Sequence, residues 1–125
     1  ERPHSGLRLT AALRRKSTVT REYFQRRWHD DHGPLALAHP DVFGFGHYVQ
    51  LHTTPDAEDF PLAKRRGSPA PFDGVSEIWL DAPTADAARS AEIRARVTAD
   101  EDDFLDRENS ILWLSEVRVV VDRPY

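Results

Sequence analysis

The 125-residue sequence predicts a single α+β domain in which four strands and two helices follow one another in the order βαββαβ. Four segments show the alternating or continuously apolar pattern of strands, and two others show the apolar spacing of helices. In addition, 39% of the residues are hydrophobic and 30% are charged, which is typical of a folded globular domain. The chain is long enough to bury one hydrophobic core but not two.

The first strand is expected at residues 7–14, where apolar side chains alternate with polar or small ones. Residues 1–6 before it are interpreted as a flexible arm. The first helix is expected to begin after Thr20, whose side chain can cap it, while Val19 and Phe24 form a hydrophobic staple.

Phe24, Trp28 and His32 recur every four residues, so they share one face of this first helix. Gly33-Pro34 is expected to interrupt the helix, because a residue that precedes proline disfavours helical backbone angles. His32 would therefore be held where a packed helix breaks, with one edge of its ring supported and the other open.

The second strand is expected at residues 42–53. One of its faces is apolar apart from His47, which is interpreted as a core or interface residue. The opposite face carries three hydrogen-bonding side chains, Tyr48, Gln50 and His52. On an ordinary two-layer domain they would face water, whereas in a barrel closed by a second copy they would line a cavity and converge on a ligand. We favour the cavity.

Residues 54–72 form a long connection that contains four prolines and the basic cluster 64–66. The pattern indicates no regular element there beyond a short helical turn near residues 59–64. A connection of this length inside a domain is usually a lid, a binding loop or disordered. We expect it at the mouth of the cavity, and we interpret the basic cluster as solvated surface.

The third strand is expected at residues 73–81, with Asp73, Glu77 and Trp79 on one face. A carboxylate beside a tryptophan is expensive to bury unless it is paired, although an exposed edge strand would explain the same pattern. The candidate partners are a histidine or an arginine, namely His32, His52 or Arg14.

A second helix is expected at residues 84–97, opened by Pro83, followed by a short extra helix at 100–107 and a last strand at 111–121. The acidic run 100–103 is interpreted as a solvated helix start. Metal binding is not expected there, because the spacing of its oxygen ligands is not that of a calcium loop. The last strand is apolar on both sides, and helices cover only one face of such a sheet. We therefore expect a second copy of the chain to cover the other face.

The composition argues against several kinds of binding partner and site. The chain has no cysteine, so a disulfide, a thiolate nucleophile and a cysteine metal site are excluded, and we expect a cytoplasmic protein. The net charge of −4, with basic residues dispersed among acids, gives no support for nucleic-acid binding. No apolar run approaches the ~20 residues that span a bilayer. The expected partners are a small molecule and a second copy, not nucleic acid or membrane.

Four motifs in the same order resemble those of the EthD family. They are the pattern Phe24-x-x-x-Trp28-x-x-x-His32-Gly33-Pro34, the tract 48–52, the segment 72–79 and the triplet Phe104-Leu105-Asp106. The resemblance extends over residues 7–121. It implies a ferredoxin-like fold with an antiparallel four-stranded sheet that pairs into a dimeric α+β barrel. It also implies a tailoring enzyme of aromatic polyketide pathways that needs no cofactor.

The resemblance is closest at His32, which favours a catalytic role over the structural role of most lone histidines. A histidine beside Trp28 would have its charged form disfavoured by burial, leaving a neutral imidazole to accept a proton. His52 is the alternative base. In this hypothesis the proton comes from a carbon next to a carbonyl.

The other candidate residues are expected to assist this proton transfer or to contact the substrate. Tyr48 would hold the developing oxyanion, and Glu77 or Asp73 would orient the histidine. The side chains expected to contact the substrate are Trp28, Gln50, Trp79 and Phe104.

The expected function is therefore a dehydration, cyclisation or related lyase or isomerase step on an aromatic or polyketide-like molecule, without a cofactor or a metal. A cofactor-free or heme-type monooxygenase of the same barrel superfamily is an alternative, with His32 or His52 as the axial heme ligand. A barrel that binds a small molecule without reacting is another.

Overall fold

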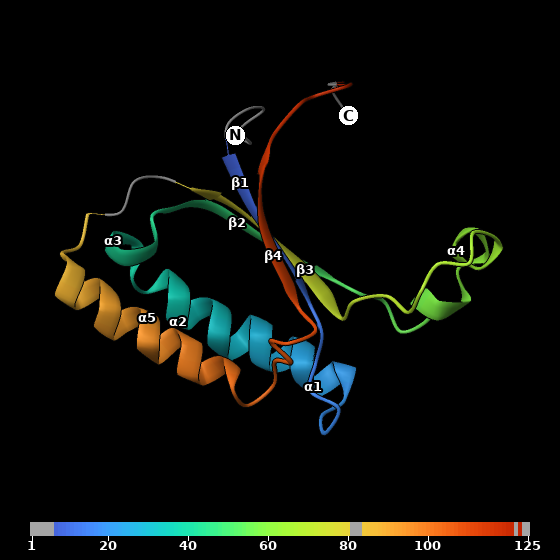
Figure 1. The fold of residues 1–125 in the computed structure, drawn as a ribbon, viewed down its shortest axis with the longest axis horizontal. Helices are drawn as coiled ribbons and strands as arrows, with labels where there is room; N and C mark the ends of the chain where they lie inside the picture. Colours follow the sequence, from blue (N-terminus) through green and yellow to red (C-terminus); the bar gives the residue numbers. More distant parts are fainter. Residues whose placement is uncertain (1–6, 81–83, 122, 124–125) are drawn as a thin grey trace.

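The computed structural model describes residues 7–80, 84–121 and 123, which form an antiparallel four-stranded sheet with helices on one face (Figure 1). Residues 1–6, Asp81 and Pro83 lie outside the described residues. The sheet order is β2-β3-β1-β4, and every neighbouring pair is antiparallel. The strands are β1 (Leu7–Leu13), β2 (Phe45–His52), β3 (Gly74–Leu80) and β4 (Ile111–Glu116). The predicted ferredoxin-like α+β fold is confirmed.

The first helical region is continuous but changes its hydrogen-bond register twice, through α1 (Arg21–Arg26), the π-helix η1 (Arg27–His32) and α2 (Gly33–Leu37). Thr20 caps α1 as predicted, since its hydroxyl accepts a hydrogen bond from the backbone of Tyr23 at 3.1 Å.

The predicted helix break at Gly33-Pro34 is wrong. The N–H of Gly33 donates to the carbonyl of Trp28, five residues back, so the chain widens into a π turn immediately before the proline. Pro34 then lies in the first turn of α2, where its missing N–H is not needed. The π turn lets the helix pass through a proline, and it holds His32 inside a continuous helix.

Two other predicted boundaries also differ from the structure. Residues 40–43 form α3 (Pro40–Phe43), which ends at Gly44 in the left-handed conformation (φ 62°), so β2 begins at residue 45. The last strand ends at Glu116 rather than 121, and Glu116 pairs with Leu7, the first residue of β1.

The predicted extra helix at 100–107 is wrong, because α5 (Ala87–Glu101) continues as far as Glu101 and the chain then turns. Leu105 forms an isolated antiparallel bridge with Arg15 after that turn. Helix α5 is capped by Asp86, which accepts a hydrogen bond from the backbone of Arg89 at 2.8 Å.

The connection 54–72 contains two short helical turns, η2 (Ala57–Asp59) and α4 (Pro61–Arg65), and the second corresponds to the turn expected near 59–64. It projects beyond the sheet, away from α2 and α5 (Figure 1). None of the described helices is long and apolar enough to cross a bilayer.

The core between sheet and helices is made of two clusters of buried side chains. One joins the first helix to the chain after α5, and it consists of Phe24, Trp28, Phe104 and Leu105. The other joins α2 and α3 to α5, and it consists of Ala36, Val42, Ile93 and Val97. The helices are thus held together at both ends of the sheet.

Trp28 packs directly over the backbone of β3. Its side chain is buried, and its ring lies 5.6 Å from Phe24 and stacks on His52 at 5.0 Å. A Cβ atom added at Gly74 would lie 2.3 Å from the Cζ3 atom of this indole, closer than real atoms approach. Only glycine at position 74 leaves room for the ring.

We predict that Gly74→Ala lowers the free energy of unfolding by about 1–3 kcal/mol, because the indole must shift within a packed core. In a Trp28→Phe background the six-membered ring of the indole is absent, so the same substitution should cost less than about 1 kcal/mol. Urea denaturation of the four proteins in this cycle measures both values. Equal costs in the two backgrounds would show that Trp28 is not the obstacle.

Candidate functional site

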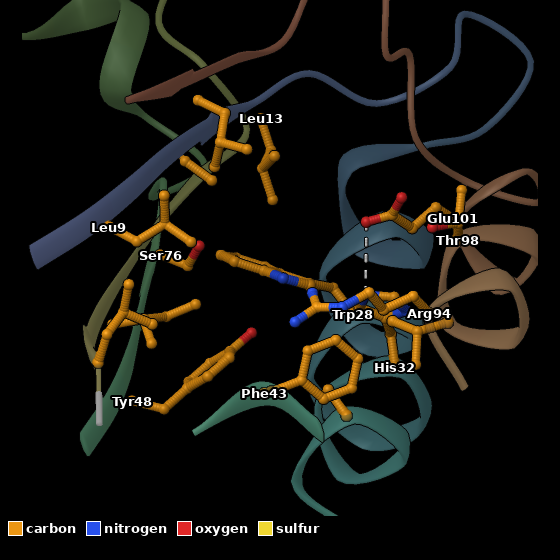
Figure 2. Close-up of a pocket in the computed structure, with 16 residues that line it drawn as sticks. Leu9, Leu13, Trp28, His32, Phe43, Tyr48, Ser76, Arg94, Thr98 and Glu101 are labelled. Atoms are coloured by element: carbon orange, nitrogen blue, oxygen red, sulfur yellow. Dashed lines mark ion pairs between the residues drawn. The ribbon is translucent and has the colours of Figure 1, made fainter. Parts of the chain in front are cut away.

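A cavity of about 540 Å³ lies between the sheet and the helices (Figure 2). This volume is in the range of small-molecule binding sites. The sheet contributes a mostly apolar wall, made of Leu9, Ala11, Leu13, Ser76, Ile78, Leu80 and Leu112. The wall formed by Tyr48 and the helices is more polar and contains Trp28, His32, Ala36, Phe43, Tyr48, Arg94, Val97, Thr98 and Glu101. The cavity reaches solvent beside β4, because Leu112 lines it and remains 65% exposed.

The chain's own helices cover the polar face of β2, whereas we expected that face to line a cavity closed by a second copy. Gln50 Nε2 donates to the carbonyl of Trp28 at 3.2 Å and to the hydroxyl of Tyr48 at 3.1 Å. Figure 2 shows that hydroxyl pointing into the cavity. Burial raises the pKa of Tyr48, and hydrogen bonds from Gln50 and Trp28 act in the opposite direction. Tyr48 is therefore a protonated phenol at neutral pH.

His32 lies between two carboxylates at the end of α5. Its Nδ1 is 3.0 Å from an Asp100 oxygen. Its Nε2 is 3.6 Å from an oxygen of Glu101, the contact marked by a dashed line in Figure 2. The ring is buried and packs edge-on against Phe104 at 5.5 Å. The first contact is a hydrogen bond and the second is longer than one. The histidine is thus oriented through Nδ1, while Nε2 and Glu101 face one another.

The two carboxylates differ in their protonation equilibria. Burial raises the pKa of Glu101 above its ordinary value, although the charges of His32 and Arg107 oppose this. Burial also acts to raise the pKa of Asp100, but hydrogen bonds from Arg27 and His32 outweigh it, and the pKa of Asp100 is lowered. Neighbouring carboxyl groups with opposite shifts are typical of a site that holds one permanent charge and moves one proton.

Arg27 fixes the position of Asp100. Its Nη2 donates to Asp100 at 2.9 Å, and its other nitrogens donate to Asp103 at 2.9 Å and Asp31 at 3.1 Å. One guanidinium on η1 therefore clamps the last turn of α5 against the helix that carries His32.

Asp73 and Glu77 lie away from this site, and their expected pairing with a histidine is wrong. Asp73 is buried at the start of β3, where it accepts hydrogen bonds from Arg21 Nε at 2.9 Å and from the backbone of Arg15 at 2.8 Å. Glu77 pairs with Arg8 at 3.1 Å on the sheet face opposite the helices. Each carboxylate is instead paired with an arginine, which was the other alternative. The arginines are Arg21 and Arg8, not Arg14.

The structure also separates the other candidates from the cavity. His52 is exposed, stacks on Trp28 and bonds to Gln50 at 2.9 Å, and it does not line the cavity. Burial and the nearby His29 lower its pKa. Trp79 lies on the far face of the sheet under Arg8, whose guanidinium is 4.0 Å from its ring. Phe104 belongs to the core and supports His32 without lining the cavity.

Sequence reasoning missed the residues that α5 contributes. The run 100–103 was interpreted as a solvated helix start, yet Asp100 and Glu101 contact His32. A signal was present, because Ile93, Val97 and Glu101 recur every four residues, and the first two are buried. The described residues contain no cluster of three or more His, Asp or Glu side chains that could hold a metal ion.

The connection 54–72, which we expected at the cavity mouth, contributes no residue to the lining. It emerges where β2 ends and β3 begins, at the end of the sheet where Asp73 binds Arg21.

We predict opposite pH dependences for two substitutions. The raised pKa of Glu101 means that its contribution to stability is present below its ordinary value of 4.5 and is lost as pH rises through the folded-state pKa. The lowered pKa of Asp100 means that its contribution is present above its ordinary value of 3.8 and is lost as pH falls through the folded-state pKa. Relative to the unsubstituted protein, the free energy of unfolding of Glu101→Gln should therefore be higher at neutral pH than at acidic pH. The relative free energy of unfolding of Asp100→Asn should be lower at neutral pH than at acidic pH.

Urea denaturation of both variants at about pH 3.5 and pH 7, on either side of ordinary carboxyl pKa values, measures this difference. A shift of the same sign in both variants would contradict the assigned environments.

Comparison with known proteins identifies the family. The EthD domain matches residues 16–108, a span that includes His32 and both carboxylates at the end of α5. A search of curated proteins finds no match. Because the family match covers well over half of the chain, the protein belongs to the EthD domain family.

Proposed function

We propose that the protein is a cofactor-independent enzyme that acts on an aromatic or polyketide-like small molecule by acid–base chemistry, in a dehydration, cyclisation or related lyase or isomerase step. The observation that carries this proposal is the placement of His32 between Asp100 and Glu101 in the wall of a largely apolar cavity. Membership of the EthD family supports a small molecule as the ligand.

His32 is the proposed base. A hydrogen bond from Nδ1–H to Asp100 places the imidazole proton on Nδ1, so Nε2 carries the lone pair that accepts a proton. In the proposed step, Nε2 removes a proton from a carbon next to a substrate carbonyl, and the C–H electron pair moves through the new C=C bond to the carbonyl oxygen. The imidazolium is stabilised by Asp100, which its neighbours keep ionised.

Two further groups complete the proposed step. The phenol of Tyr48, held by Gln50 at 3.1 Å, donates a hydrogen bond to the enolate oxygen. In a dehydration, the proton on Nε2 passes to the departing hydroxyl directly or through Glu101, whose pKa is raised by burial, and the hydroxyl leaves as water. The apolar sheet wall excludes bulk water from the enolate.

The heme-type alternative does not fit the donor set. An axial ligand needs an imidazole nitrogen that is open toward the iron. Nε2 of His52 bonds to Gln50 outside the cavity. Nε2 of His32 has the Glu101 carboxylate 3.6 Å away, which leaves room for a substrate C–H bond but not for a group as large as heme.

We also propose that a second copy of the chain covers the bare face of the sheet. Leu51, Val75, Ala12 and Ile111 are aligned across the four strands on that face, and Leu51 and Ile111 are each about half exposed. Trp113 lies on the same face of β4 and is 43% exposed. Apolar side chains on an edge strand and the adjoining face favour association.

The assembly predicted by this proposal is a homodimer at micromolar concentration. Trp113→Glu should give a monomer, because a carboxylate would be buried without a partner. Phe60→Glu, at a similarly exposed apolar residue in the 54–72 connection, should leave the dimer intact. Sedimentation velocity distinguishes these outcomes. A monomeric parent protein would rule out the dimer.

The catalytic proposal predicts that His32→Gln removes turnover while the domain stays folded. Aromatic ketones are screened in D2O, and NMR detects enzyme-catalysed deuterium exchange at the carbon next to the carbonyl. With the ketone that exchanges fastest, His32→Gln should reduce the rate by about 10²- to 10⁴-fold. Asp100→Asn should cause a smaller loss, because it disturbs orientation and charge but leaves the base.

His29→Gln is the matched control, since this histidine is on the same π-helix as His32, is exposed and does not line the cavity. It should exchange at nearly the parent rate. If His52→Gln loses exchange and His32→Gln does not, His52 is the base. A ketone that binds but shows no exchange above the solvent rate would instead indicate a non-catalytic binding protein.

A further inference from the structure

Arg94 is the cationic residue of the cavity wall, and its role is not explained by the proton-transfer step. It lies on α5 four residues before Thr98 and seven before Glu101, so the three share one face of the helix. Figure 2 shows its side chain extending from α5 into the space between helices and sheet, toward Tyr48.

The guanidinium is held in this position by α3. Its Nη2 donates to the carbonyl of Val42 at 3.1 Å, and its central carbon lies 5.0 Å from the ring centroid of Phe43. These contacts use one N–H and one face of a group that has five N–H donors. They orient the fork without neutralising its charge.

The neighbouring arginines of α5 are neutralised. Arg89 pairs with Asp41 at 2.6 Å, and Arg96 pairs with Glu92 at 3.0 Å. Arg94 is exposed at the edge of a largely apolar cavity and has no carboxylate counterion among the described residues. Such a cation favours an anionic ligand group, since a carboxylate matches the planar guanidinium with two parallel hydrogen bonds.

We infer that Arg94 binds a carboxylate of the substrate, and that the substrate is therefore a planar aromatic carboxylic acid. This inference rests on the proposed function, because it assumes that the same cavity holds the reacting molecule. On α5 the backbone positions of Arg94 and Glu101 are about 10 Å apart along the helix axis. The carboxylate would be bound by the guanidinium of Arg94 and the reacting carbon would lie at His32, with the aromatic rings between them.

The test compares two probes that differ only in charge, 2-naphthoate and its neutral isostere 2-naphthamide, by isothermal titration calorimetry. The parent protein should bind the naphthoate at least tenfold more tightly. Arg94→Gln should weaken naphthoate binding by roughly 10- to 100-fold, the usual effect of losing a charged hydrogen-bonding partner, and leave naphthamide within about twofold. Arg94→Lys should recover part of the loss.

Arg96→Gln is the matched control, because it removes the same charge from the same helix at an exposed residue outside the cavity. It should change neither affinity by more than about twofold. Equal affinities of the two probes for the parent protein, binding of neither, equal weakening of both by Arg94→Gln, or equal effects of Arg94→Gln and Arg96→Gln would each overturn the inference.

The binding test of Arg94 and the exchange test of His32 can fail independently of one another. His32→Gln should leave naphthoate affinity within about threefold, because a base acts mainly in the transition state. If Arg94→Gln loses the naphthoate selectively while His32→Gln retains full deuterium exchange, the anion site stands and the assignment of the base is wrong. If His32→Gln loses exchange but Arg94→Gln still prefers naphthoate tenfold, the base stands and the carboxylate site is wrong.

Discussion

The packing of Trp28 over Gly74 is the contact on which the rest of the structure depends. It sets how closely the first helix approaches β3, because any side chain at position 74 would overlap the indole. The same residue supplies the carbonyl that accepts from both Gly33 N–H and Gln50 Nε2. Trp28 therefore joins the sheet, the π turn and the polar face of β2. The π-helix η1 ends at His32. Because π turns inside α-helices are often found at functional sites, this placement is consistent with a role for His32 in chemistry.

Asp100 and Glu101 show how sequence neighbours acquire different chemistry. Asp100 meets Arg27 and the Nδ1 edge of His32, and these contacts overcome the effect of burial on its pKa. Glu101 faces the cavity and Nε2, where burial is the largest effect. One carboxylate is thus suited to hold the ring and the other to exchange a proton, and the division follows from where each side chain leaves the last turn of α5.

Local sequence patterns were sufficient to predict the order of the strands and main helices along the chain, the cap at Thr20 and the shared face of Tyr48 and Gln50, because these are properties of short segments. They were insufficient where a distant partner decides the outcome. The helix continues through Gly33-Pro34 because the N–H of Gly33 bonds to the carbonyl of Trp28. Asp100, in the acidic run, contacts Arg27 and His32, which are distant in the sequence. Asp73 and Glu77 looked alike in the sequence, but the arginines that neutralise them come from α1 and β1, at 52 and 69 residues' separation.

If the proposed function holds, the two sides of the cavity control different properties of the ligand. Leu9, Ile78 and Leu80 on the sheet wall carry no charge, so substitutions there change the shape and volume available and leave the electrostatics of the cavity alone. Helix α5 places Arg94, Thr98 and Glu101 on one face, in the order cation, hydroxyl and carboxyl. A rigid helix keeps these groups at fixed separations, so a molecule that engages one end is positioned at the other. Within this family fold, the size of the substrate would thus change through the strands, whereas its charge and its reaction would change through one helix.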